Sequence, residues 1–201
     1  GIPKGISRSH RILRRQHEVL QKYINLSKKD IVLTTLPVFA LDMIASGATV
    51  IMPPLRKSLP WDTIPSETVS LILKYNVNML MGSPAFLNSF VLWALKKKIK
   101  LPSIKQVYVG GGFLERELIE NLTRVCGADC KIKSIYGSTE VEPVAIIEPT
   151  KLKNYNYYGY KGFCVGKPVD ELKVKIIGFN DGPLIEDELI EARNIGEIIV
   201  S

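Results

Sequence analysis

Short apolar runs alternate with longer amphipathic segments through the first 142 residues of the chain. The short runs are rich in Ile, Val and Thr, which favours strands, and the segments after them carry apolar residues at helical spacing. Expected strands cover residues 30–36, 49–52, 77–81 and 104–109, and expected helices cover residues 8–26, 65–75, 83–95 and 114–125. Repeated strand–helix alternation predicts the α/β fold class, with a mostly parallel sheet covered by helices.

The pattern changes from about residue 143. A short strand is expected at residues 144–147, apolar and polar residues alternate over residues 172–176, and a turn is expected at residues 180–182. These features predict a small antiparallel β-subdomain that forms part of a distorted barrel. The expected division is therefore an α/β nucleotide-binding subdomain over residues 1–142 and a partial β-barrel subdomain over residues 143–201.

Composition excludes some classes of protein. The chain has 201 residues, of which 46% are hydrophobic and 23% are charged, as in ordinary globular proteins. No apolar run approaches the roughly 18 residues of a membrane span, and the start of the chain does not resemble a secretory signal. We therefore expect no membrane span and a cytoplasmic protein with reduced thiols at its three cysteines.

Metal and nucleic-acid sites receive little support from the charged and metal-binding residues. His10 and His17 are the only histidines, and on one helix they would stand about 10 Å apart, too far to share a metal. The formal net charge is +7, which is compatible with nucleic acid, anionic lipid or an anionic substrate, and equally with no specific partner. We expect no nucleic-acid partner.

The sequence YGSTE at residues 136–140 directly follows an expected strand. In open α/β sheets, ligands bind just beyond the carboxyl ends of the strands. A hydroxyl group can contact a phosphate, and a carboxylate can hold Mg²⁺. These five residues alone fit an ordinary polar turn equally well.

Three consecutive glycines, Gly110, Gly111 and Gly112, separate an expected strand from an expected helix. Dinucleotide-binding folds also begin with strand, glycines and helix, but their G-x-G-x-x-G pattern is interrupted here by residues 113–115. Each glycine costs backbone entropy, so three in a row indicate the close approach of a ligand. A sharp strand-to-helix turn is the alternative.

Six short motifs occur in one order along the chain. They are GIPKG at residues 1–5, LPVFA at 36–40, GGG at 110–112, YGSTE at 136–140, VGKP at 165–168 and GEIIV at 196–200. This ordered set resembles the adenylate-forming (AMP-binding) enzymes, the superfamily of acyl-CoA synthetases, luciferases and peptide-synthetase adenylation domains. The resemblance covers essentially the whole chain.

The resemblance implies an enzyme that uses ATP and Mg²⁺ to convert a carboxylic acid into an acyl-adenylate and then usually passes the acyl group to a thiol such as CoA. The implied catalytic residues are Thr139 at phosphate, Glu140 as the Mg²⁺ ligand, and Lys4 in the mobile tail of the phosphate loop. The residues implied for ATP or AMP binding are Gly110, Gly111, Gly112, Tyr136, Gly137, Ser138 and Thr139. The residues implied for the acyl pocket are Phe39, Ser83 and Gly137.

The chain also departs from the family pattern. Ala40 stands where many members have His, and the helix that follows looks short. The expected family segments beyond residue 201, including the small C-terminal domain with its catalytic lysine, are absent from the sequence, as is most of the phosphate loop. We therefore expect a core fragment of the large N-terminal domain, inactive or nearly so alone, whose partner is the missing C-terminal domain.

The sequence leaves alternatives open for the substrate and for the class of function. The sequence TEVEPV at residues 139–144 resembles the olefin-pathway branch, which closes β-hydroxy acids to β-lactones, and so favours a fatty-acyl or β-hydroxy-acyl substrate. Asp42 is the one candidate for binding an α-amino group. The alternatives are a basic nucleotide- or nucleic-acid-binding module that uses the Lys- and Tyr-rich residues 151–161, or a remnant that binds no small molecule.

Overall fold

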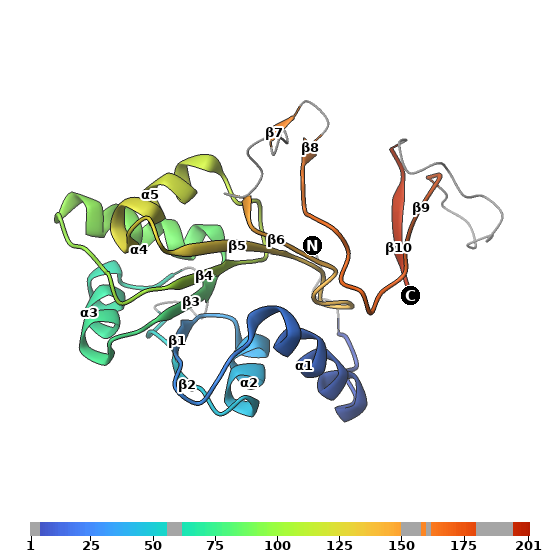
Figure 1. Cartoon of the computed structure of the whole chain (residues 1–201), viewed down its shortest axis with the longest axis horizontal. Coiled ribbons are helices and arrows are strands. Elements are labelled where there is room, and N and C mark those ends of the chain that lie inside the picture. Colours follow the sequence, from blue (N-terminus) through green and yellow to red (C-terminus); the bar gives the residue numbers. More distant parts are fainter. Residues whose placement is uncertain (1–4, 56–61, 150–157, 160–161, 180–194) are drawn as a thin grey trace.

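A six-stranded sheet forms the centre of the computed structural model, which describes residues 5–55, 62–149, 158–159, 162–179 and 195–201 (Figure 1). The strand order in this sheet is β2-β1-β3-β4-β5-β6. The strands of the sheet are β1 (Ile31–Thr34), β2 (Thr49–Ile51), β3 (Met79–Gly82), β4 (Gln106–Val109), β5 (Lys131–Tyr136) and β6 (Ala145–Ile147). The helices are α1 (His10–Ile24), α2 (Pro37–Ala45), α3 (Pro65–Tyr75), α4 (Pro84–Lys96) and α5 (Arg116–Cys126).

The strand directions confirm the predicted α/β fold class. All pairings among β2, β1, β3, β4 and β5 are parallel, and a helix connects each of these strands to the next one in sequence. The last strand, β6, pairs antiparallel with β5. It lies after residue 143 yet extends the main sheet, so the sheet runs across the expected subdomain boundary, and that division stays a prediction.

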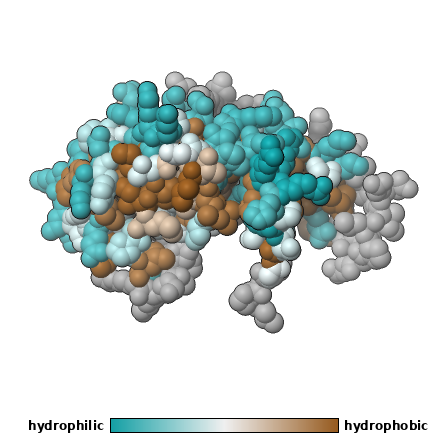
Figure 2. All heavy atoms as spheres, turned by 90° about the horizontal axis from the view of Figure 1, so that it is seen from below, coloured by the Kyte–Doolittle hydropathy of each residue, from teal (hydrophilic) through white to brown (hydrophobic). Residues whose placement is uncertain are grey.

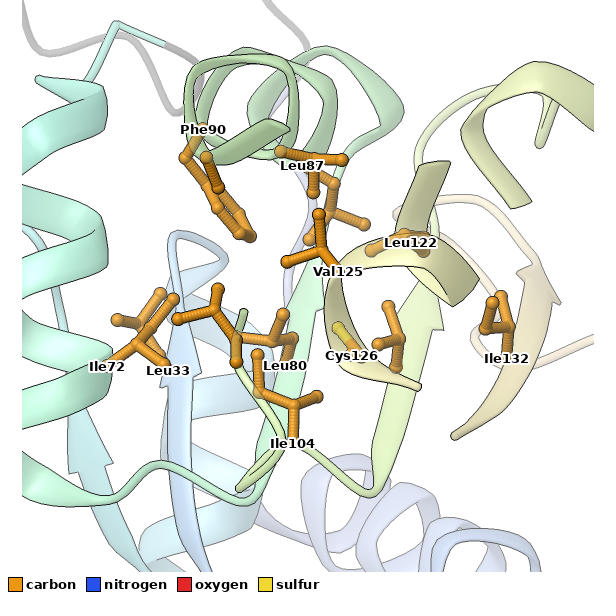
Figure 3. Packing of buried hydrophobic residues seen from close by; sticks show 14 of the residues in the cluster. Leu33, Ile72, Leu80, Leu87, Phe90, Ile104, Leu122, Val125, Cys126 and Ile132 are labelled. Carbon is orange, nitrogen blue, oxygen red and sulfur yellow. The ribbon is translucent and has the colours of Figure 1, made fainter. Parts of the chain in front are cut away.

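Helices cover both faces of the sheet. Successive side chains of a strand point to opposite faces, and the buried side chains on each face pack against helices. Helices α3, α4 and α5 bury Ile72, Phe90 and Leu122 against Leu80 and other residues on one face (Figure 3). Helices α1 and α2 bury their apolar residues against the other face, which includes Met79, Met81 and Tyr108. The core therefore consists of two layers, one on each side of the sheet.

Local sequence signals set where the helices begin. The Ser9 Oγ accepts a hydrogen bond from the Ile12 amide at the start of α1, and the Ser83 Oγ accepts one from the Phe86 amide at the start of α4, both at 3.3 Å. Proline occupies the first turn of α2, α3 and α4, where its missing amide hydrogen costs no hydrogen bond. Helix α2 has nine residues, as short as expected, but it begins at Pro37 and so includes Ala40.

The second half of the chain adds antiparallel structure. Strands β7 (Tyr158–Gly159) and β8 (Gly162–Phe163) form one antiparallel pair, and β9 (Val174–Ile177) and β10 (Glu197–Val200) form another. These pairs confirm the expected antiparallel element, whereas the barrel stays a prediction. The expected turn at residues 180–182 and most of the Lys- and Tyr-rich segment 151–161 lie outside the described residues.

The described surface gives no sign of a membrane span or a metal cluster. Across the described residues, no helix is both long and apolar enough to cross a bilayer, and no group of three or more His, Cys, Asp or Glu side chains could hold a metal ion.

The face on the side of α1 and α2 carries hydrophobic residues on one half and hydrophilic residues on the other (Figure 2). The exposed Leu41 and Ile44 of α2 are among the large hydrophobic side chains on the surface.

Candidate functional site

Three neighbouring parallel strands end at the same edge of the sheet. Strands β3, β4 and β5 pair in register, with Gly82 opposite Val109 and Val109 opposite Ser134. The Gly110 amide donates a hydrogen bond to the Gly82 carbonyl at 3.2 Å, so the chain leaves β4 directly beside the end of β3. This carboxyl edge is where open α/β sheets bind ligands.

The first turn at this edge consists of Gly110, Gly111 and Gly112, and we call it the glycine turn. Gly111 has a φ of 74°, a left-handed conformation that favours glycine. A Cβ atom on Gly112 would lie only 3.2 Å from the Cγ and Cδ atoms of Pro84, at the start of α4. The glycine turn therefore combines an unusual backbone conformation with close packing on a neighbouring helix.

The second turn covers residues 137–143 between β5 and β6, and we call it the polar turn. The Ser138 amide donates to the Val141 carbonyl at 2.9 Å, and the Val141 amide donates back to the Ser138 carbonyl at 3.2 Å. A Cβ atom on Gly137 would lie 2.9 Å from the Val141 carbonyl oxygen, so this tight return requires glycine. The fold-back leaves Ser138, Thr139 and Glu140 exposed.

A cavity of about 330 Å³ opens between the two turns. The rings of Phe113 and Phe163 stack beside it with their centroids 4.5 Å apart and their planes at 21°. The residues that line it are Gly111, Gly112, Phe113, Leu114, Ser134, Ile135, Tyr136, Gly137, Phe163, Cys164 and Val165. The walls of the cavity are thus mainly apolar and aromatic, with glycine backbone on two sides.

A smaller cavity of about 190 Å³ lies between α1 and the polar turn. The guanidinium group of Arg8 donates to the carbonyl oxygen of Thr139 and, at 2.8 Å, to the Gln16 Oε1. Glu140 and Glu142 also line this cavity. Burial raises the pKa of the Glu142 carboxyl, and the positive charge of Arg8 partly offsets that increase.

The structure brings most of the expected nucleotide-binding residues together. Gly111, Gly112, Tyr136 and Gly137 line the larger cavity, and Gly110 leads into it. Ser138, Thr139 and Glu140 lie on the adjoining polar turn. These positions agree with one site at the carboxyl edge, although the role of each residue stays a prediction.

The expected acyl-pocket residues have different surroundings, and Gly137 is the one that lines the larger cavity. Ser83 precedes Pro84, which packs on Gly112, so it lies near the glycine turn. Phe39 is 3% exposed and packs in the core on the α1 and α2 face, and it is not among the residues that line the larger cavity. Lys4 lies outside the described residues.

Asp42, the candidate partner for an α-amino group, already has a partner within the chain. Its Oδ1 lies 2.7 Å from the Nδ1 of His17 on α1. Burial raises the pKa of Asp42, and the hydrogen bond and charge of His17 oppose that shift. The neighbouring helix therefore already satisfies one carboxylate oxygen of Asp42.

Three residues of these cavities were not expected from the sequence. Arg8 reaches the polar turn across 131 positions in the chain, and the stacked Phe113 and Phe163 also come from segments far apart in the sequence. The only sequence signals were positional: Phe113 follows the glycines, and Phe163 lies two residues before the start of the VGKP segment. No periodicity or spacing rule connects such distant positions.

The fold agrees with that of the AMP-binding enzymes. The family model described as AMP-binding enzyme matches residues 1–201, and the chain belongs to this family. An olefin beta-lactone synthetase of Stenotrophomonas maltophilia (strain K279a) is 28% identical over 200 residues, which are 98% of this chain and 36% of that protein. The chain thus spans about a third of the length of this relative.

Two further similarities are to a coenzyme A ligase and to a solved coenzyme A synthetase structure. A medium-chain-fatty-acid–CoA ligase of Ectopseudomonas oleovorans is 25% identical over 146 residues, which are 71% of this chain and 26% of the ligase. The solved structure of an o-succinylbenzoate coenzyme A synthetase from Bacillus subtilis, in complex with AMP, matches with a TM-score of 0.69 and 20% identity. That match covers 100% of this chain and 38% of the synthetase chain, and it supports the fold.

Proposed function

We propose that this chain provides the adenylate-binding part of an ATP-dependent enzyme that activates a carboxylic acid as its acyl-adenylate. The observation that carries the proposal is the cavity of about 330 Å³ between the glycine turn and the polar turn. It lies at the carboxyl edge of the parallel sheet, where ligands of such folds bind. Membership of the AMP-binding family supports the choice of a nucleotide as the ligand.

The walls of the larger cavity suit a purine ring. The volume of about 330 Å³ lies at the lower end of the range of roughly 300–1,000 Å³ for small-molecule pockets. Gly112 and Gly137 keep the space clear of side-chain atoms, and Phe113 and Phe163 offer aromatic surface against which a base can stack. The exposed fractions of 66% for Phe113 and 37% for Phe163 leave ring surface available for such contact.

The exposed end of the polar turn suits phosphate and Mg²⁺. Thr139 offers a hydroxyl to a phosphate oxygen, and Glu140 offers carboxylate oxygens, the ligands that Mg²⁺ prefers. The ion, when bound, would neutralise negative charge on the phosphates. In this proposal Lys4, which lies outside the described residues, belongs to the tail of the phosphate loop, and Ser138 completes the nucleotide contacts.

The names of the relatives favour an aliphatic acid. Two olefin beta-lactone synthetases and a medium-chain-fatty-acid–CoA ligase are among them, so we propose a fatty-acyl or β-hydroxy-acyl substrate. The acyl group would then pass to CoA or, in the second candidate function, to the β-hydroxyl of the same molecule, which closes a lactone. Both outcomes use the same adenylate site, with Phe39 and Ser83 proposed near the acyl group.

Calorimetry with a non-hydrolysable acyl-adenylate mimic tests the adenylate site. We expect saturable binding that is tighter with Mg²⁺ than without it. In the Glu140→Ala variant the mimic should still bind, but Mg²⁺ should no longer increase its affinity. Glu148→Ala, on the far side of β6 in sequence, is the matched control for removal of one carboxylate.

Two results would count against the proposal. If the mimic does not bind at millimolar concentration, the proposed adenylate site is wrong. If Mg²⁺ increases affinity equally in wild type and Glu140→Ala, the proposed role of Glu140 is wrong. A titration with an oligonucleotide at two salt concentrations addresses the alternative of a nucleic-acid module, which predicts steeply salt-dependent binding. We expect no such binding.

A further inference from the structure

We propose that Arg8 is a positioning residue that holds the polar turn in the conformation from which Thr139 and Glu140 reach their ligands. The part of this inference that concerns ligands rests on the proposed function. The part that concerns the conformation of the turn rests on the structure alone. Arg8 precedes α1 and lies 131 positions from Thr139 in the sequence.

The Arg8 guanidinium connects two separate elements. One of its terminal nitrogens donates to the Thr139 carbonyl oxygen, and the other donates to the Gln16 Oε1 at 2.8 Å. Gln16 lies on α1, so this planar group connects the helix to the tip of the polar turn. A lysine ammonium carries the same charge but lacks the fixed fork that points two donors in set directions.

The helix end of this connection is itself fixed in place. The Lys133 ammonium on β5 donates to the Tyr23 carbonyl oxygen at 3.2 Å, and the Tyr23 hydroxyl accepts from the Asp170 amide at 3.0 Å. Leu20 and Ile24 of α1 are buried against the sheet. Helix α1 is therefore a firm support for a contact made from its N-terminal side.

The paired backbone bonds between Ser138 and Val141 close the base of the turn, and Thr139 and Glu140 extend beyond that closure. Arg8 also carries positive charge into the cavity of about 190 Å³ that Glu140 and Glu142 line.

Loss of Arg8 should therefore let the tip of the polar turn move without unfolding the sheet. In the proposed site, Thr139 faces phosphate and Glu140 faces Mg²⁺, and both depend on where this backbone lies. Arg8 would act on ligands only through these two residues. We expect its removal to reduce the Mg²⁺-linked part of adenylate binding more than the Mg²⁺-independent part.

Amide hydrogen exchange on the intact chain tests the positioning role without any ligand. In Arg8→Ala we expect exchange in residues 137–142 to become about tenfold faster, since a hydrogen bond from a charged donor typically contributes that much or more. Exchange in β4 should be unchanged. Arg15→Ala is the matched control, because Arg15 lines the same cavity but pairs with Glu18 at 3.1 Å on its own helix.

Arg8→Lys separates the fork from the charge. It keeps a cation beside Glu142, and we expect it to accelerate exchange in residues 137–142 while leaving β4 protected. If Arg8→Ala speeds exchange throughout the chain, that variant has lost stability generally, and Arg8→Lys then tests the local effect on the polar turn. Exchange in residues 137–142 at the wild-type rate in Arg8→Lys and Arg8→Ala would overturn the proposal.

Calorimetry of the same variants tests the consequence for binding. We expect the Mg²⁺-dependent gain in affinity for the acyl-adenylate mimic to fall about fivefold in Arg8→Ala and to be unchanged in Arg15→Ala. An unchanged gain in Arg8→Ala would overturn the functional half of the inference. Failure of the wild-type chain to bind the mimic would overturn the proposed function, and hydrogen exchange would still decide whether Arg8 positions the turn.

Discussion

The glycine turn and the polar turn lie side by side at the carboxyl edge of the sheet, yet different interactions shape them. The glycine turn depends on the absence of side chains. Gly111 adopts a left-handed conformation, and a Cβ atom on Gly112 would lie only 3.2 Å from the Pro84 ring. The polar turn is defined by hydrogen bonds, both its own backbone pair and the bond from Arg8. Packing therefore shapes the glycine turn, whereas the polar turn combines a tight backbone return at Gly137 with polar contacts.

This difference separates two tasks within one site. A wall made by close packing changes little when small ions or pH change, which suits the recognition of a flat, uncharged ring. A wall made by hydrogen bonds and charges responds to its charged neighbours, which suits phosphate and Mg²⁺. Substitutions that disturb packing should thus have larger effects on stability than substitutions that disturb charge.

Gly137→Ala should have the largest effect, because it introduces packing strain into the polar turn. A Cβ atom at this position would lie 2.9 Å from the Val141 carbonyl oxygen and 3.2 Å from the Glu142 Cα, both backbone atoms. Overpacking of this kind costs about 1–3 kcal/mol. We expect a loss of about 2 kcal/mol in the free energy of unfolding, measured by urea denaturation.

Gly110→Ala is the matched control for this substitution. It adds the same methyl group to the other turn, where the nearest atom is the Ile135 carbonyl oxygen at 3.6 Å, an ordinary contact. We expect its free energy of unfolding to change by less than about 0.5 kcal/mol. Equal losses in the two variants would show that the backbone at Gly137 is no more tightly packed than the backbone at Gly110.

Sequence patterns predicted the parts of the molecule that depend on local periodicity. The alternation of apolar strands and amphipathic helices predicted the parallel order and the helical cover, and Ser83 followed by Pro84 predicted the start of α4. The glycine turn and the polar turn were located because each directly follows a recognisable strand. In each case the signal extends over fewer than twenty residues.

Contacts between distant segments could not be predicted in this way. The bond from Arg8 to Thr139 and the stack of Phe113 on Phe163 depend on how α1 and β8 are placed relative to the sheet. Phe39 shows the same limit, since no local pattern indicated that the packing of α2 buries its side chain in the core, and its place near the acyl group stays a prediction. Side-chain direction within a short helix depends on the tertiary contacts that surround it.

Phe163→Ala tests the aromatic side of the cavity and should have an intermediate effect. An aromatic pair contributes about 0.5–1.5 kcal/mol, and both rings here are partly exposed, so we expect stability to fall by less than about 1 kcal/mol. Affinity for the acyl-adenylate mimic should fall about fivefold in calorimetry, because stacking surface is lost.

A double-mutant cycle with Phe113→Ala shows whether the two rings act as a unit. We expect the double variant to bind the mimic only slightly more weakly than either single variant, since each substitution already breaks the stack. Phe179→Ala, which removes an exposed phenylalanine elsewhere on the chain, should leave affinity unchanged. Full additivity of the two losses would argue against a joint role for the stacked pair.

Glu142→Gln tests the electrostatic side of the comparison and should have the smallest effect, because Glu142 keeps some contact with solvent. Burial raises its pKa in the folded chain above the value of about 4.3 expected in the unfolded chain. The folded chain therefore binds this proton more tightly, and the wild type should lose stability relative to Glu142→Gln as pH rises from about 4.3 through the raised pKa. Above that pKa the difference should be constant.

Arg8 determines the size of this pH effect, because its charge offsets part of the burial cost of the ionised carboxylate. In an Arg8→Ala background, the stability gained from Glu142→Gln above the raised pKa should therefore increase. Urea denaturation of the four variants between about pH 3.5 and pH 8 measures both quantities. A gain that is independent of Arg8 would mean that the guanidinium contributes to the polar turn only through its hydrogen bonds, and that charge plays no part in shaping this wall of the site.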